Sequence, residues 1–127
     1  MPSITIMIVD DSRIMRNTVK GVFSGVVPAC NFVEARDGVE AMALLKAQPI
    51  HLILLDWNMP NLSGIDFLKQ VRAMEEYKEL PIIMVTSEAA KFNVIEALKH
   101  GATDYITKPI KLDQFKSKLA KLRLFWM

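Results

Sequence analysis

Short, continuous apolar runs recur along the chain, and longer segments with helical periodicity separate them. The runs are ITIMIV, HLILL, PIIMV and TDYIT, and NFVEA between the first two adds a fifth candidate strand. They do not alternate apolar and polar residues, as strands with one solvated face would. Continuous runs are typical of parallel strands that helices cover on both faces. The pattern therefore predicts five strands of a buried parallel sheet.

The segments between the runs carry apolar residues at the spacing of one helix face. Ser12 and Ser63 suit helix N-caps, Asp37 and Glu40 resemble a capping box, and Gly101 is a typical C-terminal stop for a helix over residues 88–100. The expected buried faces are Ile14, Met15, Thr18, Val19, Val22 and Phe23; Met42, Leu44 and Leu45; Phe67, Leu68, Val71 and Met74; Val94, Ile95 and Leu98; and Leu112, Phe115, Leu119, Leu122 and Trp126. Five βα units in succession predict an α/β fold.

Length and composition restrict the class of protein. The chain has 127 residues, which suits one domain over residues 1–127, and no linker or low-complexity segment divides it. A single cysteine, Cys30, excludes an intramolecular disulfide framework and fits a reducing compartment. No apolar run approaches the roughly 18 residues that span a bilayer. A net charge of +2 gives no argument for nucleic-acid binding. We expect a cytoplasmic protein.

Polar side chains stand where the apolar runs end. Asp10 and Asp11 follow the first run, Asp56 the third and Thr86 the fourth, while Lys108 follows the last. The carboxyl ends of parallel strands lie along one edge of the sheet, where open α/β sheets bind ligands. These five side chains are therefore predicted to converge on one site.

Three carboxylates in one pocket repel each other and favour a cation. Mg²⁺ suits the oxygens of Asp10, Asp11 and Asp56, because it is a hard ion that often bridges carboxylates to phosphate. One carboxylate could then act as a nucleophile toward phosphorus, while Lys108 and the Thr86 hydroxyl bind the oxygens on which charge develops. The residue set thus predicts phosphoryl transfer with Mg²⁺ as cofactor.

Four segments of the chain resemble the receiver domain of two-component response regulators. They are VDDSRIMR at 9–16, LLDWNMPNLSGIDFLKQVR at 54–72, MVTSEA at 84–89 and GATDYITKP at 101–109, and they are most similar to the stand-alone chemotaxis regulators of that family. The resemblance implies a doubly wound, flavodoxin-like (βα)₅ fold with strand order 2-1-3-4-5. It also implies a switch that takes a phosphoryl group from a histidine kinase and catalyses only its own phosphorylation and dephosphorylation.

The resemblance implies a role for each residue of the predicted site. Asp56 is the phosphoacceptor and a metal ligand, Asp11 binds Mg²⁺ directly, and Asp10 binds it mainly through water. The backbone carbonyl of Asn58 is a further ligand. Thr86 and Lys108 bind the phosphoryl group, and the peptide bond between Lys108 and Pro109 is cis.

Further residues are implied in the response and its control. Tyr105 is an aromatic switch that turns inward as Thr86 shifts, and Asn58 and Glu88 tune hydrolysis of the aspartyl phosphate and contact a phosphatase. Lys91, Tyr105 and Lys118 belong to an output face. The implied output partner is a flagellar motor switch protein or another protein target, which a monomer contacts.

Other functions share parts of this pattern. Haloacid-dehalogenase phosphatases also form an aspartyl phosphate, but their signature is Asp-x-Asp-x-Thr after the first strand, whereas Asp10 and Asp11 are adjacent. A flavodoxin needs a phosphate loop at the place where these two carboxylates would repel the flavin phosphate. Within the receiver class, a phosphorelay intermediate and a receiver excised from a larger regulator remain alternatives to the chemotaxis regulator.

Overall fold

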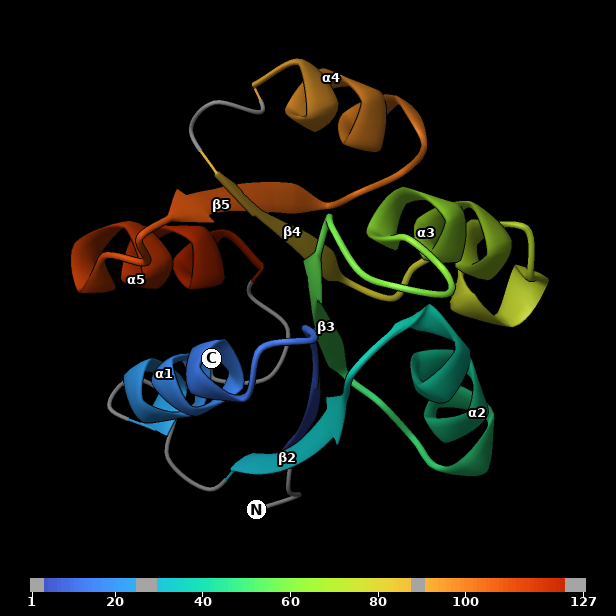
Figure 1. Cartoon of the computed structure of the whole chain (residues 1–127), viewed down its shortest axis with the longest axis horizontal. Coiled ribbons are helices and arrows are strands. Elements are labelled where there is room, and N and C mark those ends of the chain that lie inside the picture. The colour runs from blue at the N-terminus through green and yellow to red at the C-terminus, as the bar shows by residue number, and fades with distance from the viewer. Residues whose placement is uncertain (1–3, 25–29, 88–90, 123–127) are drawn as a thin grey trace.

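Five parallel strands form one sheet with the order β2-β1-β3-β4-β5 (Figure 1). The computed structural model describes residues 4–24, 30–87 and 91–122. The strands are β1 (Ile4–Val9), β2 (Cys30–Ala35), β3 (Leu52–Asp56), β4 (Ile82–Ser87) and β5 (Asp104–Lys108). Both the predicted parallel sheet and the strand order implied by the resemblance are confirmed.

Helices cover both faces of the sheet, as the continuous apolar runs require. The helices are α1 (Arg13–Ser24), α2 (Gly38–Ala47), α3 (Gly64–Arg72), α4 (Lys91–Lys99) and α5 (Leu112–Leu122), with a short 3₁₀ helix η1 (Glu75–Tyr77) after α3. Helices α1 and α5 lie on one face, and α2, α3 and α4 lie on the other (Figure 1).

The two faces of the sheet have separate apolar cores. Ile6 and Ile8 of β1 pack with Phe23 of α1 and Phe115 of α5, whose ring centroids lie 4.9 Å apart in an edge-to-face arrangement. Met7 and Val9 belong to the core beneath α2, α3 and α4. Successive side chains of a strand point to opposite faces. A strand that is buried on both faces therefore needs the unbroken apolar run seen in the sequence.

The predicted starts of the first three helices are confirmed by their capping hydrogen bonds. The Ser12 hydroxyl accepts from the Met15 amide at 3.2 Å, the Asp37 carboxylate accepts from Glu40 at 2.8 Å, and the Ser63 hydroxyl accepts from Asp66 at 3.3 Å. Each bond satisfies an amide of a first helical turn. The helices thus begin where local side-chain chemistry places them.

The predicted buried face of α4 is partly wrong. Val94 and Ala97 are buried, whereas Ile95 and Leu98 are 58% and 45% exposed. Helix α4 contacts the sheet along a narrow stripe, so apolar residues beside that stripe remain at the surface. Ile14 and Thr18 of α1 and Leu112 of α5 were also predicted to be buried and are exposed. Trp126 and the predicted start of the fourth helix at residues 88–90 lie outside the described residues.

Across the described ranges, each helix is too short or too polar to cross a lipid bilayer.

Candidate functional site

The carboxyl ends of β1, β3, β4 and β5 bring four of the predicted site residues together. Asp10 follows β1, Asp56 ends β3 and lies opposite Val85, and Thr86 of β4 is paired with Thr107, next to Lys108. Asp10, Asp56 and Thr86 are only 5%, 6% and 4% exposed. Polar groups are rarely buried to this degree without a structural or chemical reason.

Three carboxylates and one ammonium group meet at this edge. Asp10, Asp11 and Asp56 each offer an oxygen, and these oxygens all lie within 4.8 Å of one another. Asp11 is exposed, so the cluster is open to solvent on one side. Lys108 Nζ lies 2.9 Å from Asp56 Oδ1 and 3.6 Å from Asp10 Oδ2. The site therefore holds three acidic groups against one basic group.

The electrostatics of the site follow from burial and from this excess of acid. Burial raises the pKa of Asp56; the hydrogen bond from Lys108 opposes the shift, and the charges of Asp10 and Asp11 add to it. Burial alone would lower the pKa of Lys108, but its hydrogen bond and attraction to Asp56 and Asp10 raise it. Lys108 is thus held as a cation, and the carboxylates still favour a further positive charge.

The donor set fits a hard divalent cation. All three ligand atoms are carboxylate oxygens, and two of the carboxylates are buried. Asp10 Oδ1 already accepts the Ser12 amide at 2.9 Å, which leaves Oδ2 on the side of Lys108. Mg²⁺ binds proteins through one or two carboxylates and retains several waters, which matches a cluster that is open on its Asp11 side.

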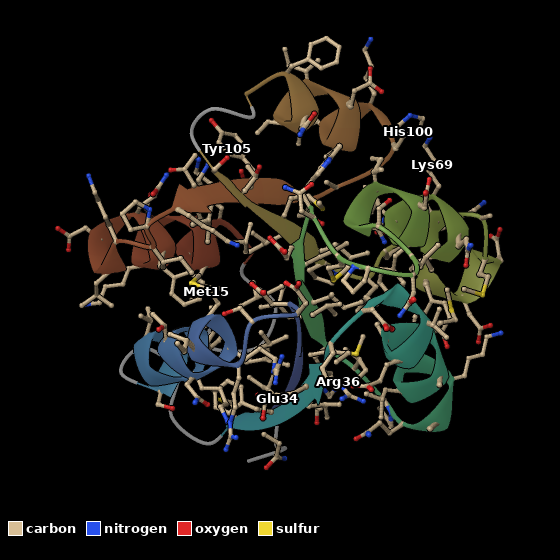
Figure 2. The ribbon with its side chains drawn as sticks, viewed as in Figure 1. Met15, Glu34, Arg36, Lys69, His100 and Tyr105 are labelled. Atoms are coloured by element: carbon tan, nitrogen blue, oxygen red, sulfur yellow. The ribbon has the colours of Figure 1, made fainter. Side chains whose placement is uncertain are left out.

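Arg16 positions Asp10, although it was not among the site residues predicted from the sequence. Its Nη1 donates to the backbone carbonyl of Asp10 at 2.7 Å, and its Nε donates to Glu34 Oε1 at 3.0 Å. Glu34 of β2 also accepts from Lys20 at 3.1 Å (Figure 2 labels Glu34). The spacing of Arg16 with the buried residues Val19 and Phe23 could have indicated an inward-facing arginine.

We expect Glu34→Gln to lower the free energy of unfolding by roughly 0.5–1 kcal/mol at pH 7, in the range of partly exposed ion pairs. The hydrogen bond from Lys20 and the weaker effect of Arg16 hold the pKa of Glu34 below its ordinary value of 4.5, against the effect of burial. A lowered carboxyl pKa stabilises the folded state above pH 4.5, and this contribution is lost as the pH falls through the lowered value. Thermal unfolding of both proteins between pH 7 and 3 should therefore show that the difference between their melting temperatures narrows as the pH falls. A difference that widened would contradict the assignment.

Gly64 is a second residue near the site that was not predicted from the sequence. Its amide donates to the Trp57 carbonyl at 3.0 Å, at the first turn of α3. A Cβ at this position would overlap the backbone carbonyl oxygen of Asp56 and lie 3.0 Å from the Trp57 Cα. The absence of a side chain therefore allows α3 to begin directly against the end of β3.

Gly64→Ala should destabilise the fold by about 1–3 kcal/mol, because the added methyl group forces the backbone of Asp56 to move. Chemical denaturation measures this loss. Gly21→Ala in α1 is the matched control, since a Cβ there meets no atom within 4 Å. The control should stabilise the helix by roughly 0.5–1 kcal/mol. Equal effects of the two substitutions would exclude the overlap with Asp56.

Some of the remaining predicted residues lie near the site, and others lie outside the described part of the chain. Trp57 is partly buried beside Asp56. Asn58 is exposed, and the role of its backbone carbonyl as a metal ligand stays a prediction. The peptide bond between Lys108 and Pro109 is cis, as predicted. Glu88 lies outside the described residues. Lys91 is the first residue of α4, but its side chain is not described.

The predicted output residues Tyr105 and Lys118 contact each other. Tyr105 is partly buried on β5, and Lys118 Nζ lies 4.4 Å from the centroid of its ring (Figure 2 labels Tyr105). Lys118 Nζ also lies 2.9 Å from Asp104 Oδ1. The cation and the ring are thus held together in this structure, and the ring belongs to β5, the strand that also carries Lys108.

Comparisons with known proteins agree with this arrangement. Chemotaxis protein CheY-3 of Vibrio cholerae is 43% identical over 117 residues, which cover 92% of this chain and 89% of that protein. Chemotaxis protein CheY1 of Helicobacter pylori is 44% identical over 115 residues, which cover 90% and 92%. The solved structure of Chemotaxis response regulator CheY4 of Vibrio cholerae has a TM-score of 0.84 and 30% identity, with coverage of 95% and 99%.

A family match covers most of the chain and includes every strand except the start of the first. Residues 6–120 match the family described as "Response regulator receiver domain". That range contains the three carboxylates, Thr86 and Lys108. The chain therefore belongs to the response regulator receiver domain family.

Proposed function

We propose that the chain is a phosphorylation-activated switch of a two-component system, in which Asp56 accepts a phosphoryl group from a histidine kinase. One observation carries the proposal: a buried carboxylate on Asp56 is hydrogen-bonded to Lys108 and lies within 4.8 Å of two more carboxylates. Three acidic groups with one fixed cation suit a reaction that brings a phosphoryl group and a divalent ion together.

The chemistry is an in-line displacement at phosphorus. A carboxylate oxygen of Asp56 forms the new O–P bond, while the P–N bond to the donor histidine breaks and its electron pair returns to the imidazole nitrogen. Bound Mg²⁺, held by Asp10, Asp11, Asp56 and the Asn58 carbonyl, would supply charge neutralisation at the phosphoryl oxygens. The Lys108 ammonium, which lies 2.9 Å from Asp56 Oδ1, would bind one of the same oxygens once the carboxylate is phosphorylated.

Thr86 supplies the second contact to the phosphoryl group. Thr86 is 4% exposed, and its hydroxyl has no hydrogen-bond partner among the described residues, so it keeps its remaining contact with solvent. A hydroxyl that gains a partner only when the phosphoryl group is present binds one state better than the other. Such differential binding is what shifts a two-state equilibrium. We infer that Thr86 and Tyr105 carry the response from Asp56 to the surface.

The proposed response is a contact with another protein. The relatives named above are chemotaxis proteins, which supports signalling in chemotaxis through a flagellar motor switch protein. We propose that residues 1–127 act as a single cytoplasmic, monomeric receiver, with Lys91, Tyr105 and Lys118 on the output face. Asn58 and Glu88 would tune dephosphorylation and contact a phosphatase. A phosphorelay intermediate, which passes the phosphoryl group to a histidine phosphotransfer domain, is the alternative.

Emission from Trp57 tests the proposed reaction. The indole lies next to Asp56 in the chain, so its emission should fall when Mg²⁺ binds and fall again when acetyl phosphate is added. The measurement uses Trp126→Phe, because Trp126 is the other tryptophan. In that background Asp11→Asn should weaken the first change, because it removes one carboxylate of the cluster. Emission unaffected by Mg²⁺ and acetyl phosphate would contradict the proposal.

A further inference from the structure

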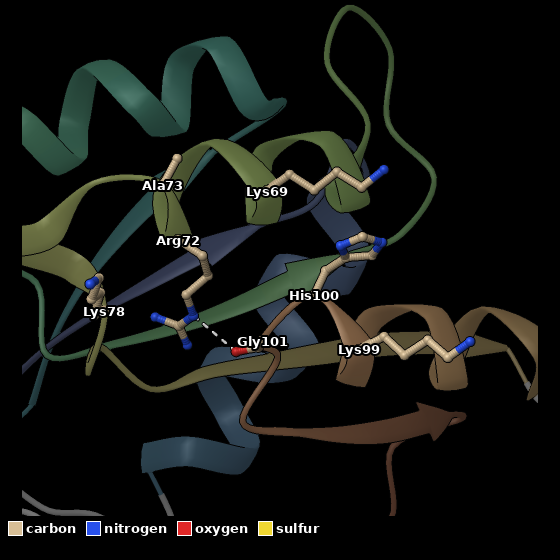
Figure 3. Close-up of a pocket in the computed structure, with 7 residues that line it drawn as sticks. All are labelled: Lys69, Arg72, Ala73, Lys78, Lys99, His100 and Gly101. Carbon is tan, nitrogen blue, oxygen red and sulfur yellow. Dashed lines mark hydrogen bonds between the residues drawn. The ribbon is translucent and has the colours of Figure 1, made fainter.

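A shallow cavity that is widely open to solvent lies at the opposite edge of the sheet from Asp56. It is lined by Lys69, Arg72, Ala73, Lys78, Lys99, His100 and Gly101 and has a volume of about 490 Å³ (Figure 3). These residues come from the end of α3, the segment between η1 and β4, and the end of α4. The volume falls within the roughly 300–1,000 Å³ of small-molecule sites.

The lining is strongly basic. Four of the seven residues are lysine or arginine, and none is acidic. Lys78 Nζ forms an ion pair with Glu75 Oε2 at 2.6 Å, and His100 Nε2 lies 3.6 Å from Glu96 Oε2. Lys69 and Lys99 have no ion pair with any residue of the described ranges. Figure 3 shows the His100 ring between these two lysines, one on α3 and one on α4. Two unpaired cations on facing helices therefore remain available to a ligand.

Arg72 fixes the shape of this cavity. Its Nε donates to the Gly101 carbonyl at 2.9 Å, and its Nη1 donates to the Tyr77 carbonyl at 2.6 Å. Gly101 has a φ of +100°, and a Cβ there would lie 3.1 Å from Arg72 Cγ. The guanidinium thus joins α3 to the segments before β4 and β5. The walls are held in place before any ligand binds, which reduces the entropy cost of binding.

We propose that this cavity binds the phosphate chain of a small molecule that carries at least two phosphate groups. Lys69 and Lys99 each meet a separate anionic group, which matches a diphosphate or triphosphate better than a single phosphate. Ala73 is the only apolar side chain in the lining, and the other apolar surface comes from the carbon atoms of the basic residues and Gly101. The charged groups are therefore the part of the lining that can select a ligand, and recognition rests on the phosphate chain. The site is independent of phosphoryl transfer at Asp56.

Titration with pyrophosphate, tripolyphosphate and ATP tests the proposal. The buffer contains EDTA, so that metal-bridged binding at Asp10, Asp11 and Asp56 is prevented. Calorimetry gives the affinity, and amide chemical shifts of Gly101 and Ala102 report on occupancy of the cavity. All three compounds should bind and shift these amides. Binding of ATP alone would overturn the assignment of the phosphate chain as the recognised group.

Matched charge variants distinguish binding at this cavity from nonspecific attraction of an anion to a basic protein. The double variant Lys69→Gln, Lys99→Gln should weaken binding of tripolyphosphate about tenfold. The control, Lys46→Gln with Lys116→Gln, removes the same charge from exposed positions on α2 and α5 and should leave the affinity unchanged. Equal losses in both variants would overturn the proposal, as would unchanged Gly101 and Ala102 amides. Both variants should still be phosphorylated by acetyl phosphate, which distinguishes a failure here from a failure of the proposed switch.

Discussion

Asp56→Asn should abolish phosphorylation of the chain by acetyl phosphate and Mg²⁺. Asparagine keeps the shape of the side chain at the end of β3, but its amide is a very poor nucleophile toward phosphorus. The loss should be complete, because Asp10 and Asp11 are proposed to bind the metal and Asp56 alone to attack. A phosphate-affinity gel measures the phosphorylated fraction after incubation with the donor.

Asp113→Asn is the matched control for this substitution. Asp113 is an exposed carboxylate in the first turn of α5, and it lies outside the acidic cluster. The control should be phosphorylated to the same extent as the unsubstituted protein. Retained phosphorylation of Asp56→Asn would show that another carboxylate is the acceptor.

Thr86→Ala should leave Asp56 able to accept a phosphoryl group but remove the increase in partner affinity that follows. The substitution deletes the hydroxyl of a buried residue while leaving the acidic cluster and Lys108 in place. Without that hydroxyl, the phosphorylated state loses a contact that distinguishes it from the unmodified state. The partner is first identified by its retention on the chain with beryllofluoride and Mg²⁺, and is then titrated against both proteins with and without phosphorylation.

Thr18→Ala provides the comparison for this experiment. Thr18 is exposed on α1, and its hydroxyl donates only to the Ile14 carbonyl at 2.9 Å. This variant should keep the full gain in affinity on phosphorylation. If Thr86→Ala kept that gain as well, the response would have to pass through other residues.

The strands, and the edge of the sheet that carries the site, were predictable because both depend on local sequence signals. A strand buried on both faces needs an unbroken apolar run, and β1, β3 and β4 each have one. Residues that follow such runs must lie at one edge of a parallel sheet. The convergence of Asp10, Asp56 and Lys108 could therefore be inferred without coordinates, although their distances could not.

Features that depend on packing between distant segments were not predicted from the sequence. The periodicity of α4 did not reveal that Ile95 and Leu98 lie beside the contact stripe, because the width of that stripe depends on how the helix sits on β4 and β5. Gly64 looked like an ordinary residue after an N-cap until its closeness to the Asp56 carbonyl was known. The basic cavity joins residues that are up to 32 positions apart, and no motif marks it.

Trapping the acyl phosphate with borohydride tests the central proposal most directly. Borohydride reduces an aspartyl phosphate to homoserine, so the acceptor position is marked by a stable change that peptide mass spectrometry can locate. After treatment with acetyl phosphate and Mg²⁺, homoserine should be found at position 56, and omission of Mg²⁺ should greatly reduce its amount. Homoserine at position 10 or 11, or none under any condition, would contradict the assignment of Asp56 as the phosphoacceptor.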